Sequence, residues 1–251
     1  MGYRLRVTGY RRKVKVRKII SQSTVDGPGN RFAIFLQGCN IRCLYCHNPE
    51  TQAMEDAEAQ EMTTAELIEA IRPCVPFLRG VTVSGGECML QPKQLTELFR
   101  AVKALAAEMH HPLTCLLDSN GTIAFSRHPE LMQYCDGVML DVKAWDDAVY
   151  ERLTGAKTNS VVRENVRWLL KHDLLEEVRI VCLPGRVDVE TILQNIAEIF
   201  DSIGKKAPVR LLRFRPHGVI GELANAQMPT DAEMAAYSEL AAWYGLQTTI
   251  R

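Results

Sequence analysis

The feature that most constrains the fold is a regular alternation of short apolar runs with longer stretches of helical periodicity. The apolar runs predict six strands, at residues 31–37, 81–84, 113–118, 137–141, 178–183 and 209–213. Between them, apolar residues recur at helical spacing, for example over residues 95–105 and 192–203. Strands that alternate with helices are typical of βαβ units. The sequence therefore predicts an α/β fold whose parallel sheet curls into an open or partial barrel.

Two helix starts and the absence of a linker indicate the domain organisation. Thr63 followed by Glu66, and Thr230 followed by Glu233, have the spacing of capping boxes. No Gly/Ser-rich linker interrupts the alternation, which predicts one domain over residues 19–251. Residues 1–18 form a basic N-terminal extension with eight Lys or Arg between Arg4 and Lys18. A docking arm for an acidic partner, a transit peptide and a solvated lead-in strand are all compatible with it, and the strand is favoured.

Composition excludes several classes of protein. The chain has 251 residues, of which 47% are hydrophobic, and 30 basic residues balance 30 acidic ones. The net charge of zero argues against a strongly basic nucleic-acid-binding protein. No run of 18 apolar residues is present to span a membrane, and the N-terminus lacks the apolar region of a secretory signal. We expect a soluble protein of the reducing cytoplasm, where grouped cysteines indicate metal or redox chemistry rather than disulfides.

Polar and glycine-rich segments follow the predicted strands in succession. CNIRCLYCHN comes after the first strand, SGGE ends the second, DSNG the third and DVK the fourth. Arg179 opens the fifth strand, LPG follows it, and RPHG follows the sixth. In barrels of parallel strands the chemistry lies at the carboxyl ends of the strands. The segments therefore predict one shared site.

Three closely spaced cysteines dominate that site. Cys39, Cys43 and Cys46 form a C-x3-C-x2-C run on the loop after the first strand. A structural zinc site or an electron-transfer [4Fe–4S] cluster normally takes four protein ligands. Three thiolates would leave one iron open to an exogenous ligand, whereas His47 is too near Cys46 to be a convenient fourth ligand. The other five cysteines are scattered among apolar residues and are expected to be buried: Cys74, Cys88, Cys115, Cys135 and Cys182.

These residues resemble the radical S-adenosylmethionine (radical SAM) superfamily, and within it the glycyl radical enzyme activases typified by pyruvate formate-lyase activating enzyme. The resemblance runs from about residue 19 to the C-terminus. It rests on STVDGPGNRFAIFLQGCNIRCLYCHNPE, VTVSGGECMLQP, TCLLDSNG, CDGVMLDVKAW, VRIVCLPG and RFRPHG. Some activases carry a ferredoxin-like insert after YCHN, but here residues 49–63 form a short acidic connector without cysteine.

The resemblance implies an oxidoreductase with a partial (β/α)6 barrel. Cys39, Cys43 and Cys46 would hold a [4Fe–4S] cluster, which cleaves SAM reductively to a 5′-deoxyadenosyl radical that abstracts hydrogen from a glycine of a partner enzyme. It also implies a glycyl radical enzyme as partner, a flavodoxin or ferredoxin as electron donor, a monomeric state, and no nucleic-acid or membrane partner.

The resemblance further assigns residues to three groups, with Ser84 preceding the glycines of the SAM group. The SAM-binding group comprises Tyr45, His47, Gly85, Gly86, Glu87, Ser119, Lys143, Arg179 and His217. The monovalent-cation group comprises Asp118, Ser119, Met139 through its carbonyl, and Asp141. The group facing the substrate peptide comprises Asp26, Gly27, Pro28 and Gly29.

Two other functions stay open on the residues alone. One is a radical SAM enzyme that acts on a small molecule, such as a deazapurine carboxylate synthase. The other is a non-catalytic iron–sulfur or zinc protein. The DGPG and YCHN segments favour the activase.

Overall fold

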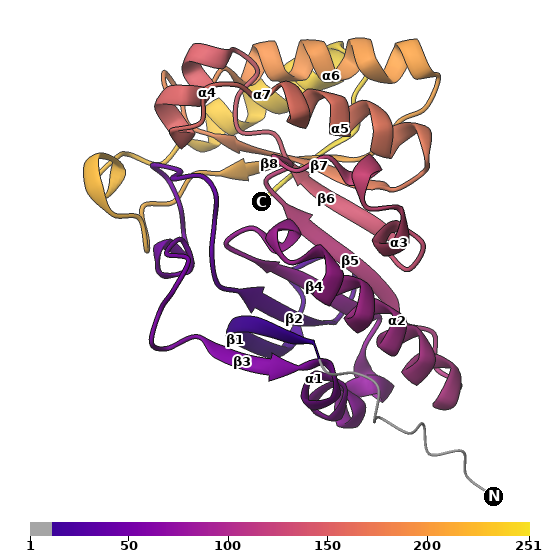
Figure 1. Cartoon of the computed structure of the whole chain (residues 1–251). Coiled ribbons are helices and arrows are strands. Elements are labelled where there is room, and N and C mark those ends of the chain that lie inside the picture. Colours follow the sequence, from indigo (N-terminus) through magenta and orange to yellow (C-terminus); the bar gives the residue numbers. More distant parts are fainter. Residues whose placement is uncertain (1–11) are drawn as a thin grey trace, which may run out of the picture. The chain divides into compact units, whose positions relative to one another are not determined.

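The computed structural model describes residues 12–251, and the chain divides into two compact units (Figure 1). The first unit comprises residues up to Cys39 together with Ala53–Asp118 and His128–Gly137. The second comprises Asn40–Gln52, Ser119–Arg127 and Val138–Arg251. Residues 1–11 of the predicted extension lie outside the described residues, and the predicted boundary at residue 19 falls inside a strand.

The first unit is built on strands in the order β3-β1-β2-β4-β5. Their bounds are β1 (Lys13–Ser23), β2 (Arg31–Leu36), β3 (Gln60–Thr63), β4 (Gly80–Gly85) and β5 (Thr114–Ser119), whose last residue belongs to the second unit. β1 pairs antiparallel with both β2 and β3, whereas β2, β4 and β5 are parallel. The apolar run in β2 is buried almost completely, which explains why it lacks the alternation of a half-exposed strand.

Helices cover this sheet in sequence: α1 (Thr64–Ile71), α2 (Pro92–Glu108) and α3 (Pro129–Met132). α2 contacts both α1 and α3. The predicted capping box opens α1, since the Thr63 hydroxyl accepts a hydrogen bond from Glu66 N and the Glu66 carboxylate accepts one from Thr63 N. α2 begins at a proline, and its apolar stripe, including Leu98 and Val102, is buried as predicted.

The basic strand β1 is paired with the acidic connector. Arg17 forms ion pairs with Asp56 at 2.6 Å and Glu58 at 2.5 Å. Lys15, two residues before Arg17 on β1, forms an ion pair with Glu55 of the connector. Lys15 and Arg17 of the predicted extension therefore belong to a folded strand, and nearby acidic residues neutralise their charges.

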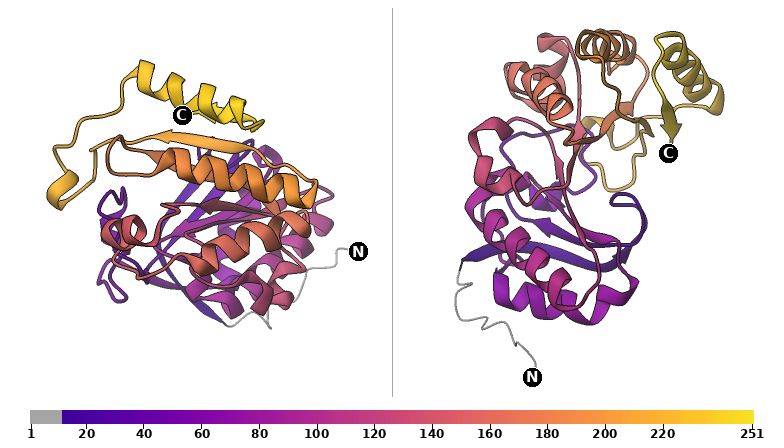
Figure 2. Two further views of the ribbon diagram at one scale, coloured as in Figure 1. Left: turned by 90° about the horizontal axis from the view of Figure 1, so that it is seen from above. Right: turned by 90° about the vertical axis from the view of Figure 1, so that its right-hand side faces the viewer.

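The second unit contains parallel strands in the order β6-β7-β8-β9. Their bounds are β6 (Gly137–Asp141), β7 (Leu175–Cys182), β8 (Val209–Arg213) and β9 (Thr248–Ile250). The helices are α4 (Asp147–Thr154), α5 (Ser160–Lys171), α6 (Val189–Ile203) and α7 (Asp231–Trp243). α5, α6 and α7 lie side by side (Figure 2), with α5 against β7 and α7 against β8. The second predicted capping box, Thr230 with Glu233, opens α7.

All six predicted strands are present, and the mixed α/β class is confirmed. β7 begins at Leu175 rather than at residue 178, so Arg179 lies inside the strand and not at its start as predicted. β1 overlaps the basic segment for which a lead-in strand was favoured, whereas β3 and β9 were not predicted. In β1, buried Val14 and Val16 alternate with Lys13 and Lys15, and the charges obscured that alternation. β3 and β9 are short, with four and three residues.

Among residues 12–251, no helix combines the length and the apolar character needed to cross a bilayer.

Candidate active site

The cysteine loop leaves β2 and enters the second unit between Cys39 and Asn40. Cys39 is buried, whereas Cys43 and Cys46 are partly exposed, and none of the three forms a disulfide. In the second unit the loop backbone is fixed to the end of α4, because Arg42 N and Leu44 N donate to the carbonyls of Thr154 and Leu153. Across residues 12–251, no three His, Cys, Asp or Glu side chains gather as a metal-binding group. The assignment of the three thiols to one cluster therefore stays a prediction.

Tyr45, Lys143 and Asp141 come together in the second unit. The Lys143 ammonium is 2.8 Å from Asp141 Oδ2 and 5.8 Å from the centre of the Tyr45 ring. Burial lowers the pKa of Lys143, but the negative charges of Asp141 and Cys43 more than offset it, and the pKa lies well above its usual value. Lys143 is therefore a permanent cation beside the cysteine loop, able to meet a carboxylate.

The Tyr45 side chain is buried with its hydroxyl unsatisfied. Within residues 12–251 that oxygen has no hydrogen-bond partner, although the residue is only 4% exposed. Burial raises the pKa of Tyr45 far above its usual value, so the phenol stays protonated. An orphaned buried hydroxyl is costly, and a bound group that hydrogen-bonds to it would remove that cost.

The second half of the cysteine loop meets the RPHG loop that follows β8. The His47 ring nitrogen Nε2 lies 2.9 Å from the carbonyl oxygen of Arg215. A Cβ added to Gly218 would lie 2.9 Å from the His47 carbonyl oxygen. Two predicted SAM-binding segments are thus in contact in the second unit, and the imidazoles of His47 and His217 are both exposed there.

The SGGE segment ends β4 in the first unit. Gly85 has φ +117°, and a Cβ there would lie 2.1 Å from the Leu36 amide nitrogen, so only glycine fits against β2. Gly86 N donates to the Leu36 carbonyl at 3.0 Å. The Glu87 carboxylate accepts from Met89 N at 2.9 Å and caps the short 3-10 helix Cys88–Leu90. Glu87 is buried, and its predicted part in SAM binding stays a prediction.

The predicted cation ligands already have partners of their own. Asp118 Oδ2 accepts a hydrogen bond from the Ser84 hydroxyl at 2.8 Å in the first unit. In the second unit the Ser119 hydroxyl oxygen accepts from Gly121 N at 3.0 Å. Asp141 is the ion-pair partner of Lys143. Hard oxygen atoms are available at each position, and the cation itself stays a prediction.

Arg179 forms a buried ion pair rather than a surface one. It is 9% exposed; its Nε donates to Glu177 at 2.6 Å, and its Nη2 lies 2.8 Å from Met139 Sδ. Glu177 also pairs with Arg210 at 2.7 Å. Strand register aligns Arg179 with Asp141, the last residue of β6. Glu177 and Arg210 were not predicted as part of the site. Arg210 lies 33 positions from Glu177 and meets it only because β7 and β8 pair.

The DGPG segment connects the antiparallel strands β1 and β2. Gly27 has φ +123° and Gly29 φ +74°, conformations that favour glycine at both positions. The Ser23 hydroxyl donates to Asp26 Oδ2 at 2.5 Å, and the Thr82 hydroxyl donates to the Asp26 carbonyl at 2.7 Å. Thr82 and Ser84 lie on the same face of β4 because side chains alternate along a strand. The first unit therefore brings the DGPG turn and the Ser84–Asp118 pair to one sheet face.

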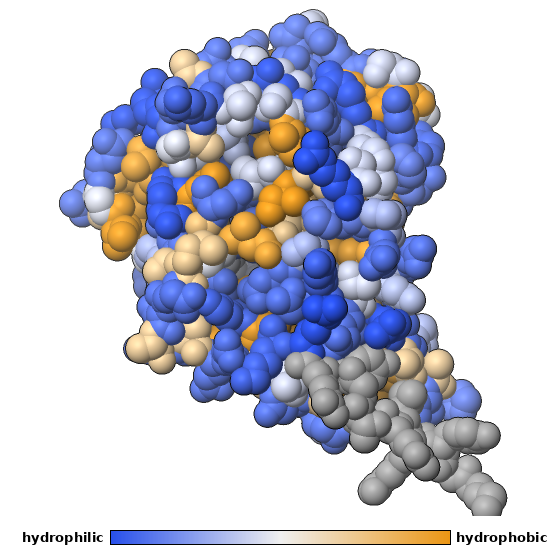
Figure 3. Space-filling model, viewed as in Figure 1, coloured by the Kyte–Doolittle hydropathy of each residue, from blue (hydrophilic) through white to orange (hydrophobic). Residues whose placement is uncertain are grey.

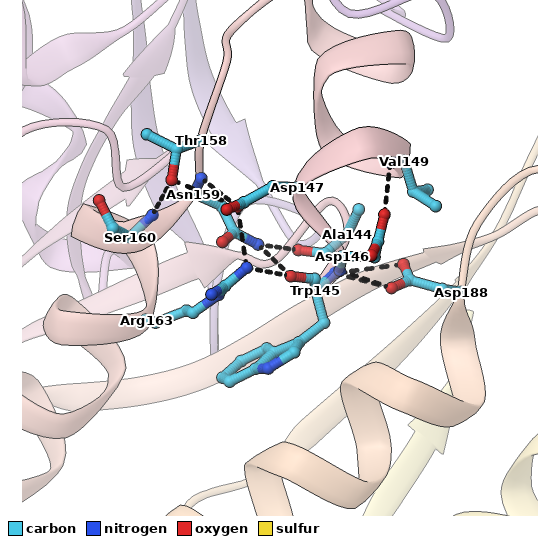
Figure 4. A network of polar contacts seen from close by, with 10 residues as sticks. All are labelled: Ala144, Trp145, Asp146, Asp147, Val149, Thr158, Asn159, Ser160, Arg163 and Asp188. Atoms are coloured by element: carbon cyan, nitrogen blue, oxygen red, sulfur yellow. Dashed lines mark hydrogen bonds and ion pairs between the residues drawn. The ribbon is translucent and has the colours of Figure 1, made fainter.

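A polar network fixes the loop that follows Lys143 (Figure 4). The Asp188 carboxylate accepts hydrogen bonds from Trp145 N at 3.0 Å and Asp146 N at 2.8 Å. Asn159 Nδ2 donates to the Ala144 and Trp145 carbonyls. These residues were absent from the sequence prediction, although Asp146 three residues before Val149 is a recognisable helix cap.

Apolar side chains are exposed on the long loop between β8 and α7. Ile220 is 67% exposed and Met228 is 48% exposed. Figure 3 shows hydrophobic colour over this loop at the edge of the view. The loop follows the RPHG segment, so apolar surface lies next to a predicted SAM-binding element.

Four of the remaining five cysteines are buried as predicted, whereas Cys74 is partly exposed. Burial raises the pKa of both Cys135 and Cys182 to about 12. These two thiols stay protonated near neutral pH and are poor metal ligands.

Comparison with known proteins agrees with the motifs. The sequence pattern of the radical SAM superfamily matches residues 33–196. A protein of Haemophilus influenzae, named provisionally as a glycyl-radical enzyme activating enzyme, is 34% identical, over 93% of this chain and 94% of its own. The pyruvate formate-lyase-activating enzyme of Staphylococcus epidermidis is 35% identical, over 87% of this chain and 91% of its own.

Solved structures share the fold. A radical SAM methyltransferase from Sphaerobacter thermophilus matches 88% of this chain and 66% of its own, with a TM-score of 0.64 and 13% identity. A domain of pyruvate-formate lyase-activating enzyme from Bacteroides vulgatus matches 68% of this chain and 98% of its own, with a TM-score of 0.56 and 22% identity. The predicted fold class, a partial barrel of the radical SAM type, is confirmed. The chain belongs to the radical SAM superfamily and, within it, to the activating enzymes of glycyl radical enzymes, which are oxidoreductases.

Proposed function

We propose that this protein activates a glycyl radical enzyme by means of a [4Fe–4S] cluster bound through Cys39, Cys43 and Cys46. Membership of the radical SAM superfamily implies the cluster and SAM. When bound, the cluster supplies one electron that splits SAM into methionine and a 5′-deoxyadenosyl radical, which takes a hydrogen atom from one glycine of the partner enzyme. The observation that carries the proposal is one loop with three cysteines that form no disulfide, in a chain about a third identical to named activating enzymes.

The residues present fit these two groups. Cys43 and Cys46 are accessible thiols, and thiolates are the usual ligands of iron–sulfur clusters. The orphaned Tyr45 hydroxyl offers a hydrogen-bonding group beside the loop. Lys143 offers a cation that can bind the SAM carboxylate. The rest of the proposed SAM-binding set is Gly85, Gly86, Glu87, Ser119, Arg179, His47 and His217.

Asp141 has a carboxylate that pairs with Lys143 and is also a proposed ligand of a monovalent cation. We propose that Asp118, Ser119, the Met139 carbonyl and Asp141 provide oxygen ligands for such an ion. The Lys143–Asp141 ion pair is compatible with this role, because a carboxylate has two oxygen atoms and one of them can accept from Lys143 while the other binds the ion.

The DGPG turn would receive the glycine segment of the partner, which is proposed to be a glycyl radical enzyme. Asp26 is partly exposed and Gly29 is exposed, so both are accessible to a peptide. A flavodoxin or ferredoxin is the proposed electron donor. None of the eight cysteines forms a disulfide, which supports residence in a reducing compartment, and we propose the cytoplasm.

Anaerobic reconstitution tests this function. The purified protein should bind iron and sulfide in equal amounts and form 5′-deoxyadenosine from SAM under dithionite. Pyruvate formate-lyase is then added, because the relatives from Staphylococcus epidermidis and Staphylococcus aureus are named as its activating enzymes. It should show the doublet of a glycyl radical by electron paramagnetic resonance. Zinc without iron, or no cleavage of SAM, would contradict the enzyme. Cleavage with turnover of a small substrate and no radical on any glycyl radical enzyme would contradict the activase.

A further inference from the structure

Arg31 is a fully buried arginine at the start of β2. It is 0% exposed, and its side chain points across β4 to β5 within the first unit. The guanidinium donates to the Val81 carbonyl at 2.7 Å and to the Thr114 carbonyl at 3.1 Å. Burying a charged side chain is expensive unless hydrogen bonds compensate for the lost water. A leucine would fill the same space without the cost of burying a charge. The hydrogen bonds of the guanidinium therefore indicate the role of Arg31.

Arg31 reaches the DGPG turn by two routes. Its Nε donates to the Thr82 hydroxyl oxygen at 2.5 Å, and that hydroxyl donates to the Asp26 carbonyl at 2.7 Å. Its Nη1 also lies 3.4 Å from the Pro28 carbonyl oxygen. The hydroxyl of Thr82 has one proton to donate, and it is directed to Asp26 because Arg31 can only donate. The turn is thus held by two of its own carbonyl oxygens.

The turn also packs on the Arg31 side chain. A Cβ added to Gly27 would lie 2.7 Å from Arg31 Cδ and 3.2 Å from Leu116 Cδ1. Gly27 is buried, whereas Asp26 on one side is half-buried and Gly29 on the other is exposed. One side of the turn is therefore fixed on Arg31, and the other side remains accessible.

The turn is bound to the face of β4 that also carries Ser84. Thr82 and Ser84 are two residues apart on β4, so their side chains are separated by about 6.6 Å along the same face. Thr82 binds the turn, and Ser84 binds Asp118 at the carboxyl end of β5. β4 thus fixes the position of the DGPG turn relative to Asp118, because one strand binds both.

We propose that Arg31 is a positioning residue that acts through Thr82 to hold the DGPG turn ready for the glycine segment of the partner. The inference rests on the proposed function, since it takes the turn as the peptide-binding element. A turn fixed before binding loses little conformational entropy when the peptide binds, and this strengthens peptide binding without any new contact. The arrangement therefore affects the protein substrate and not the cleavage of SAM.

Thr82→Val tests the proposal, because valine keeps the shape of threonine and removes the hydroxyl between Arg31 and Asp26. The matched control is Thr114→Val. The Thr114 hydroxyl also accepts a hydrogen bond from Arg31, at 2.9 Å, but it donates to the Arg79 carbonyl and not to a carbonyl of the turn. Both variants lose one hydrogen bond of the same guanidinium, so a difference between them isolates the link that the Thr82 hydroxyl makes to Asp26.

Two measurements are made on the reconstituted holoenzyme. Amide hydrogen exchange of Asp26, Gly27 and Gly29 should speed up about tenfold in Thr82→Val and stay within about twofold of wild type in Thr114→Val. With pyruvate formate-lyase as substrate, the KM for radical formation should rise about tenfold in Thr82→Val alone, while cleavage of SAM without the partner is retained.

Each outcome decides a separate claim. Unchanged exchange in Thr82→Val would overturn the positioning role, and faster exchange with an unchanged KM would overturn its connection to the protein substrate. Equal effects in Thr82→Val and Thr114→Val would reduce Arg31 to a structural residue. Wild-type protein that cleaves SAM but forms no radical on any glycyl radical enzyme would instead contradict the proposed function.

Discussion

The carboxylate of Glu177 lies 2.6 Å from the Nε atom of Arg179, two residues away on the same face of β7. Both side chains are less than a tenth exposed, and the second Glu177 oxygen pairs with Arg210. The acid therefore holds the guanidinium that the family resemblance assigns to SAM. Because Nε is bound to Glu177, the orientation of the guanidinium is fixed, and its Nη2 atom contacts Met139.

Glu177→Gln should lower the free energy of unfolding by about 3 kcal/mol, because it leaves two guanidinium groups without their buried counter-charge. Urea unfolding measures the change. Glu176→Gln, at the neighbouring and less buried position, is the control and should change stability by less than about 0.5 kcal/mol. Equal destabilisation by the two variants would show that the buried pair has no special role.

Gly85→Ala should prevent the normal end of β4 from forming. The residue has φ +117°, and its Cβ would overlap backbone atoms of Leu36, which cannot move aside as a flexible side chain could. Gly204→Ala is the matched control, since Gly204 has φ +72° at the end of α6 with nothing within 4 Å of the added atom. We expect a cost of about 1 kcal/mol at Gly204 and loss of SAM binding with clearly larger destabilisation at Gly85. Thermal unfolding and SAM titration distinguish the two, and similar results would contradict the steric argument.

The fold could be predicted where its signal was local. The six buried strands and both capping boxes depend on residues close in sequence, so periodicity and spacing were sufficient. A lead-in strand was favoured for the basic N-terminal segment, but its charges suggested a solvated strand, whereas Val14 and Val16 of β1 are buried. Its charges are neutralised by acidic residues about forty positions away, a pairing that only the fold produces.

The candidate site divides in the same way. Asp141 and Lys143 were both predicted, and their two-residue separation at a strand end brings them within 2.8 Å. Arg31 was left without a role, because its partner Thr82 lies 51 positions away on another strand. Asp188 was missed for the same reason, since the loop it holds precedes it by more than forty residues. Charged residues inside strands or at helix starts find their partners on other strands and loops when the chain folds, and a local sequence pattern does not predict such pairs.

Cysteine substitutions should separate the proposed cluster ligands from core residues. Cys39→Ala, Cys43→Ala and Cys46→Ala should each abolish iron binding and formation of 5′-deoxyadenosine. Cys135→Ala should retain both, because burial raises the pKa of that thiol to about 12 and keeps it protonated. Iron analysis and chromatography of the nucleoside products check this. Loss of iron from all four variants alike would mean that the cluster has been assigned to the wrong residues.

The pH dependence of stability should change when Asp188 is replaced. Burial raises the pKa of Asp188 above its usual value, although backbone N–H groups of Asp146 and Trp145 partly oppose the shift (Figure 4). Because the folded state binds this proton more tightly than the unfolded state, the stabilisation is present at low pH and is lost as pH rises through the folded pKa. The stability of wild type relative to Asp188→Asn should therefore fall between about pH 4 and neutrality. Urea unfolding across that range measures the difference, with Asp201→Asn, an exposed acid on α6, as the control for losing one charge. If the wild type instead gained stability over Asp188→Asn as pH rose, the two backbone hydrogen bonds would outweigh burial, and the network that holds the Lys143 loop would depend on an ionised carboxylate.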